Sequence, residues 1–143
     1  MHNFFKIKSM KLTSNTETIA ASATKTYDFL CHLIQTTQAP PIPDITDWHA
    51  DEQGCSFTIK NMITCNMRLT DAVPYQYVIY HLDTDKSVSA NVHFRIESMG
   101  TESTLQVEAE ADMPFWIQAM LKGPMEQMMG TVMGKLKEVI ERS

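Results

Sequence analysis

Between Ile45 and Met113 apolar and polar residues alternate in six short runs separated by turn residues. Alternation with a period of two places apolar side chains on one face of a strand and polar side chains on the other. The pattern predicts six consecutive antiparallel strands, over 48–52, 55–59, 64–72, 75–82, 87–99 and 105–112. In the run 75–82 both faces carry aromatic or β-branched residues, which predicts a central strand that is covered on both sides or lies near a wide mouth.

Before this region the pattern indicates a strand, a helix and a loop. The Thr-rich segment 11–19 alternates loosely and predicts a strand. Apolar residues then recur at spacings of four, three and four after Ser22, a natural N-cap, which predicts a helix over about 22–34. Pro40, Pro41 and Pro43 follow in a segment that should be irregular and is long enough to form one rim of a cavity.

After Pro114 the apolar period becomes helical and continues to Ile140. This predicts a helix of about 25 residues, long enough to cross a curved sheet. Pro124 removes one backbone hydrogen bond, so we expect the pair Gly123–Pro124 to kink the helix or divide it in two. A sheet with one polar face must cover its apolar face, and this helix would supply the cover.

The order of elements is thus strand, helix, irregular rim, six strands and long helix, which predicts an α+β helix-grip fold. In this fold a curved antiparallel sheet of about seven strands wraps around a long C-terminal helix. The sequence resembles the START-like superfamily, also called SRPBCC, birch-pollen-allergen-like or polyketide cyclase-like, and in particular a small branch typical of Bacteroidetes. Three stretches carry the resemblance, which covers about residues 10–142: ETIAAS (17–22), WHADEQGCSFTIKNM (48–62) and KGPMEQMMGTVMGKLKEVI (122–140).

The length of the chain and the lack of an internal repeat predict a single domain over residues 1–143, of the START-like kind that the resemblance implies. Chains of this branch usually begin near Met10, so residues 1–9 are either an N-terminal extension or a lengthening of the first strand. Members of the branch often carry glycines after the CSFTI-type strand. Here Asn61, Met62 and Ile63 stand instead, so we expect that turn to differ.

Composition and charge narrow the functional classes. The chain has 143 residues, 43% of them hydrophobic, and a formal net charge of −5, which argues against a nucleic-acid-binding surface. Three cysteines without CxxC spacing are typical of reduced thiols in a cytosolic protein. No apolar run approaches the roughly 18 residues of a transmembrane helix, and the N-terminus lacks a signal-peptide core. We therefore expect a cytoplasmic protein without stable membrane insertion.

Methionine is unusually frequent, with 11 in the chain, and six of them lie from Met113 to Met133. Unbranched, polarisable methionine side chains either fill a closed core or line a pocket that adapts to apolar ligands. In the second interpretation, helix residues face sheet residues across a cavity, and Tyr77, Tyr80 or His81 would orient the ligand. The predicted ligand-binding residues are Phe57, Met67, Tyr77, Ile79, His81, Val92, Phe94, Met120, Met125, Met128 and Met129.

Residues for catalysis or metal binding are not evident in the sequence. No two of the five histidines have metal-ligand spacing. Glu108, Glu110 and Asp112 share one strand face, but the opposite face packs better, so we expect all three to face water, with Arg95 or Arg68 relieving their repulsion. We predict no catalytic residue, metal or cofactor.

The resemblance implies that the protein binds an apolar small molecule or lipid between the sheet and the C-terminal helix. Two alternatives stay open: a cyclase- or aromatase-like enzyme, and a protein-interaction module that docks a partner through the sheet's polar face or the rim 38–46. An enzyme would need a polar group of matched pKa inside the cavity.

Overall fold

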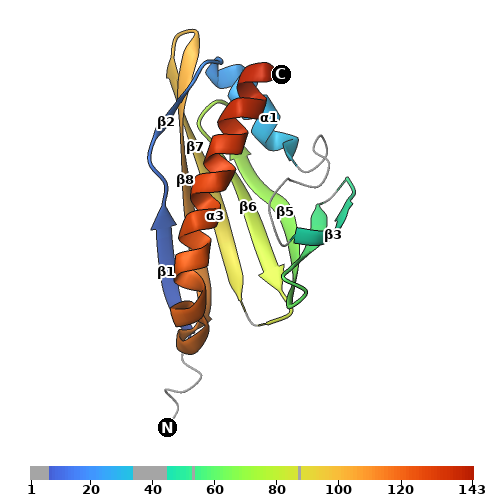
Figure 1. Ribbon diagram of the computed structural model, residues 1–143. Helices are drawn as coiled ribbons and strands as arrows, with labels where there is room; N and C mark the ends of the chain where they lie inside the picture. Colours follow the sequence, from blue (N-terminus) through green and yellow to red (C-terminus); the bar gives the residue numbers. More distant parts are fainter. Residues whose placement is uncertain (1–6, 34–44, 53, 87) are drawn as a thin grey trace.

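The computed structural model describes residues 7–33, 45–52, 54–86 and 88–143. Its strands form one antiparallel sheet in the order β1-β8-β7-β6-β5-β4-β3, with β2 also paired to β8 (Figure 1). The strands are β1 (Ile7–Thr13), β2 (Glu17–Ile19), β3 (Ile45–Ala50), β4 (Cys55–Ile59), β5 (Ile63–Val73), β6 (Tyr77–Thr84), β7 (Ser89–Met99) and β8 (Glu102–Pro114). The six predicted strands after residue 45 are all present.

The N-terminal segment differs from its prediction, because two strands replace the single strand expected over 11–19. The interruption lies at Ser14, whose backbone N–H donates to the carbonyl oxygen of Val107 at 2.8 Å. The Ser14 hydroxyl oxygen also accepts a hydrogen bond from the Val107 N–H at 2.9 Å. A polar side chain thus replaces part of the backbone ladder, and β1 and β2 bind different stretches of β8.

Two helices accompany the sheet, α1 (Ala23–Cys31) and α3 (Phe115–Arg142). The predicted N-cap is present, since the Ser22 hydroxyl accepts from the backbone N–H of Lys25 at 3.2 Å. α1 ends three residues before the predicted end.

α3 is one helix of 28 residues and contains Pro124 within it. The division expected at this proline does not occur. Pro124 lies on the exposed side of the helix, close to the exposed residues Met120 and Gly123, so water can satisfy the backbone carbonyl that the proline leaves without a donor. Together with the sheet, the long helix confirms the predicted helix-grip α+β fold.

The sheet has an apolar face toward the helices, called the inner face, and a polar outer face. Strand alternation separates them, since Val78, Tyr80 and Phe94 are buried on the inner face while Arg95 is exposed on the outer face. Across β7 and β8, Arg95 and Glu108 form an ion pair at 3.4 Å, and Lys11 on β1 approaches the same carboxylate at 3.5 Å. This pairing confirms the relief of repulsion that was expected from Arg95.

The buried residues form two clusters under the helices. The larger cluster joins α1 and the C-terminal half of α3 to the sheet through Leu30, Leu105 and Ile140, each fully buried. The smaller cluster lies under the N-terminal half of α3 and contains Met10, Met113 and neighbouring apolar residues. Within the described part of the chain, no helix is both long and apolar enough to cross a membrane.

Candidate functional site

α3 covers only part of the inner face. The helix packs mainly on β8, β2 and β1 and touches α1, whereas α1 packs on β6, β7 and β8. Figure 1 shows α3 running along the β1–β8 side of the sheet, while β5 and β6 lie beside it rather than under it. α3 therefore leaves the inner face of the strands from β4 to β7 largely without helix contacts of its own.

Apolar side chains on these strands remain partly accessible. Leu69, which pairs with the buried Tyr80 across β5 and β6, is 41% exposed. Its neighbours on the same face pack against the core but are only half-buried. We call this surface the open inner patch; it consists of Ile59, Ile63, Met67, Leu69, Ala72, Leu82 and Val92. Small-molecule sites are lined predominantly by apolar side chains of this kind.

Six of the predicted ligand-binding residues come together at or beside the open inner patch. Met67 and Val92 belong to it, and Phe57 and Phe94 are buried in the core next to it. From the helix, Met129 packs against both clusters and Met125 packs against the smaller one. The aromatic ring of Trp48 on β3 stacks on Phe57 with 5.8 Å between ring centroids, which extends the aromatic wall toward the sheet edge.

The other predicted residues lie elsewhere. Tyr77, Ile79 and His81 occupy outer-face positions of β6, because Val78, Tyr80 and Leu82 take the inner ones. Met120 is 60% exposed on the helix, and Met128 is half-buried. The structure thus divides the eleven predicted residues between two faces of the sheet and two sides of the helix.

Four residues of the open inner patch, all on β5 or β6, were not among the predicted ligand-binding residues: Ile63, Leu69, Ala72 and Leu82. Leu69 follows Met67 by two positions, so strand alternation already placed both on one face. Strand alternation does not predict the inner-face position of Ala72, because a register shift lies between Leu69 and Asp71. The inner-face position of Leu82 was not evident because β6 has apolar residues on both faces. Ile63 was not evident because it follows an atypical turn.

The buried polar side chains on the described part of the inner face are few and already hydrogen-bonded. The buried Tyr80 hydroxyl donates to the backbone carbonyl of Leu30, and burial raises the pKa of Tyr80 above its usual value. Ser103 donates to the carbonyl of Ala21 at 2.9 Å, and its hydroxyl oxygen lies 2.9 Å from that of Thr26. These bonds attach α1 to the sheet.

Two thiols also lie on the inner face. Cys55 and Cys65 are buried on β4 and β5, and both are free cysteines. Removal from water raises the pKa of each thiol to about 11. Both groups are therefore uncharged at neutral pH, and their low thiolate content makes them weak nucleophiles.

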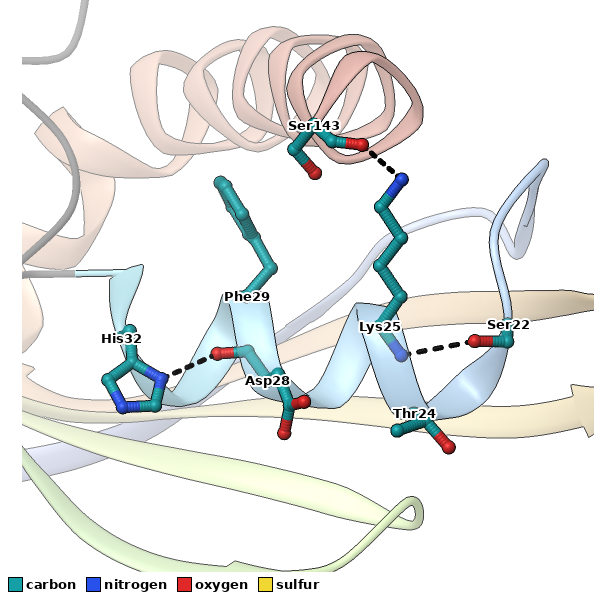
Figure 2. A pocket seen from close by; sticks show the side chains of 7 residues that line it. All are labelled: Ser22, Thr24, Lys25, Asp28, Phe29, His32 and Ser143. Carbon is teal, nitrogen blue, oxygen red and sulfur yellow. Dashed lines mark hydrogen bonds between the residues drawn. The ribbon is translucent and has the colours of Figure 1, made fainter.

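One surface hollow lies between α1 and the end of α3, away from the open inner patch (Figure 2). It measures about 450 Å³ and is open to solvent. The Lys25 ammonium group donates to the backbone oxygen of Ser143 across it, and a His32 ring nitrogen lies 2.8 Å from the backbone oxygen of Asp28. Its lining residues are Ser22, Thr24, Lys25, Asp28, Phe29, His32 and Ser143.

The outer face carries a second open hollow of about 590 Å³ on β6 and β7, where Tyr77, Ile79 and His93 are among the lining residues. Beside it, the two ring nitrogens of His81 lie 2.8 Å from Asn91 Oδ1 and 2.9 Å from Asp83 Oδ1. His81 is thus part of a hydrogen-bonded surface network. Within the described residues, no group of three or more His, Cys, Asp or Glu side chains could hold a metal ion.

Comparison with known proteins identifies the fold. The sequence matches no family model and no curated protein. An aromatase/cyclase from a Streptomyces species superposes with a TM-score of 0.68 at 16% identity, covering 96% of this chain and 95% of that chain. Norcoclaurine synthase from Thalictrum flavum gives 0.65 at 9% identity, covering 94% of each chain. A START superfamily protein from Mycobacterium smegmatis gives 0.59 at 12% identity, with 90% and 98% covered.

Proposed function

Since the chain has the helix-grip fold of START-like proteins, we propose that it binds an apolar small molecule or lipid between the inner face of the sheet and α3. The observation that supports this function best is the open inner patch. Leu69 and its half-buried apolar neighbours lie next to a packed core, and a bound apolar molecule would remove their remaining surface from water. Met67 from the sheet and Met129 from the helix would adapt to the shape of such a ligand.

The inner face supports binding rather than catalysis. Among its described side chains on β4 to β8, the groups that could exchange a proton are Tyr80, Cys55 and Cys65, all held in the neutral form by burial. A cyclase- or aromatase-like reaction would call for an acid or base with a pKa near the working pH. The rim segment invoked for a protein-interaction module lies largely outside the described residues. The cytoplasmic location stays a prediction from the sequence.

The proposal is tested first by asking whether the purified protein carries or takes up an apolar molecule. Native mass spectrometry of the fresh protein should detect a bound mass that is lost on denaturation. Titration with Nile red, an uncharged dye whose emission rises in apolar surroundings, should saturate at one molecule per chain. A linear, unsaturable signal together with a ligand-free mass would contradict the proposal.

Matched methionine variants then locate the site. Met129→Gln should weaken Nile red binding about fivefold or more, because the glutamine amide would lose water without gaining a partner. Met120→Gln makes the same chemical change at a residue that is 60% exposed, so it should alter the affinity by less than about twofold. Leu69→Gln, at a position 41% exposed, tests the sheet side with little risk to folding. Equal effects at Met129 and Met120 would exclude the inner face as the site.

A further inference from the structure

The inner face of β4 to β8 carries no acidic or basic side chain among its described residues. Cross-strand pairing assigns each charged residue of these strands to the outer face: Arg68 pairs with His81, and His93 pairs with Glu108. The inner positions hold aliphatic, aromatic and sulfur-containing residues, together with the hydroxyl-bearing Tyr80, Thr84, Ser98 and Ser103. A ligand on this face would therefore meet no side chain of opposite charge.

The helices do not supply a charge either, since the buried residues of α1 are Ala23, Thr26 and Leu30. The inner side of the C-terminal half of α3 consists of Met129, Met133, Leu136 and other apolar residues. The ammonium group of Lys137 points to the backbone oxygen of Thr18 at 2.6 Å and to Glu141 at 2.7 Å, so its charge is already used at the end of the helix.

The segment 34–44 contains no positively charged residue. Its sequence, IQTTQAPPIPD, has Asp44 as its single ionisable residue. Whatever its arrangement, this segment contains no lysine, arginine or histidine that could pair with a ligand carboxylate, phosphate or sulfate.

From this distribution, and resting on the proposed function, we propose that the site selects uncharged ligands and rejects the anionic form of an otherwise identical molecule. An ionised group placed against the open inner patch would lose its water and gain no compensation there, because none of the patch side chains carries a charge or a hydrogen-bond donor. The Tyr80 hydroxyl, the one phenol on this face, is already bonded to Leu30. The ligand class is thus a neutral alcohol, ester, ketone or hydrocarbon rather than a free fatty acid or other carboxylate.

The test compares decanol with decanoate as competitors for bound Nile red at about pH 8, where the carboxyl group is ionised. Decanol should displace the dye with at least tenfold higher affinity, about 1.4 kcal/mol. Lowering the pH to about 5 should bring the affinity of the acid closer to that of the alcohol, because a growing fraction of the acid is then protonated. The affinity of decanol at both pH values is the control for any change in the protein itself. Equal displacement by both competitors at about pH 8 would overturn the inference and leave the proposed function standing. If neither the dye nor decanol binds, the proposed function itself fails.

A charge introduced at the patch provides the converse test. Leu69→Lys should raise the affinity for decanoate relative to decanol at least about fivefold, measured against Leu69→Gln as the uncharged polar control. Leu69 is 41% exposed, so both variants should fold, which circular dichroism verifies. An unchanged ratio of affinities in the lysine variant would overturn the inference, because the ligand head group would then not lie against this face.

Discussion

The Tyr80 side chain in β6 donates a hydrogen bond from its hydroxyl to the backbone carbonyl of Leu30 in α1. Both residues are buried, with exposures of 1% and 0%. The bond therefore satisfies a carbonyl near the end of a helix in a place that water does not reach. It also holds α1 against the strand next to the open inner patch.

Removing this hydroxyl should destabilise the protein. Tyr80→Phe leaves the Leu30 carbonyl without its donor, which should lower the free energy of unfolding by about 1–3 kcal/mol. Tyr77→Phe is the matched control, since the Tyr77 hydroxyl bonds to Asp71 at 3.2 Å on the exposed face and its loss should cost less than about 0.5 kcal/mol. Urea denaturation of both variants measures the difference. Equal losses of unfolding free energy in the two variants would show that the buried hydrogen bond stabilises the protein no more than the exposed one.

The turn between β5 and β6 should prefer glycine over alanine at position 75. The N–H of Gln76 bonds to the carbonyl of Val73 at 3.0 Å, and Tyr75 between them has a φ of 67°. This left-handed conformation costs a side-chain-bearing residue about 1–2 kcal/mol. Both Tyr75→Ala and Tyr75→Gly lose the edge contact with Tyr27, whose ring centroid lies 5.6 Å away. The glycine variant should nevertheless be more stable than the alanine variant by about 1 kcal/mol in thermal unfolding. A more stable alanine variant would contradict the presence of backbone strain at position 75.

The three thiols should react at different rates in the native protein. Cys31 is half-buried, whereas Cys55 and Cys65 are buried and have thiol pKa values of about 11. An alkylating reagent at neutral pH should therefore modify one thiol quickly in the folded state and all three in denaturant. Cys31→Ser should abolish the fast phase, as mass spectrometry can verify. Rapid modification of Cys65 in that variant would contradict its burial.

The same two thiols predict a loss of stability at alkaline pH. Each folded-state pKa, about 11, lies above the unfolded value of about 8.5, so the unfolded chain releases its protons first as the pH rises. Their stabilising contribution is complete below about pH 8.5 and is lost as the pH rises toward 11. Between about pH 8 and 10 the loss should be about 2 kcal/mol per thiol. A variant that combines Cys55→Ala with Cys65→Ala should have a flatter pH profile; an unchanged slope would assign the effect to other groups.

Glycines in α3 should be replaceable with a gain in stability. A Cβ atom added at Gly130 or Gly134 would meet nothing within 4 Å, so Ala there should stabilise the helix by up to about 1 kcal/mol. Gly54 provides the contrast, because its added Cβ would lie 2.3 Å from the backbone oxygen of Met67. Gly54→Ala should therefore destabilise the protein. Calorimetry of the three variants checks the signs, and a stabilising Gly54→Ala would refute this local packing.

Sequence periodicity was sufficient for the fold where each strand had one apolar and one polar face. In β7 and β8 the alternation around Phe94 and Val107 predicted the buried side of both strands. β6 lacked this contrast, since Tyr77 and Ile79 are as apolar as Val78 and Tyr80, and the pattern within the strand did not show that Tyr77 and Ile79 lie on the outer face. The face on which each β6 side chain lies is set by the register with β5 and β7, and the sequence of β6 alone does not contain that information.

Prediction of the site residues on α3 was limited by a different physical effect. Spacing along α3 separated Met129 from the surface, but Met120 lies on the exposed side despite its chemical identity with the buried methionines. Composition alone does not distinguish a methionine that packs from one that faces water. The partial coverage of the sheet by α3 also depends on where the helix lies, and local sequence does not determine that position.

The pairing of β1 with β8 has a consequence for synthesis of the chain. Ser9 and Glu110, which interact across these strands, are 101 residues apart. At about 5–20 residues per second on the ribosome, β1 waits for about 5–20 s before its partner is made. During that time its backbone donors and acceptors are open to pairing with another chain. Lys8 and Lys11 give the waiting strand a positive charge, which discourages nascent chains from associating through it.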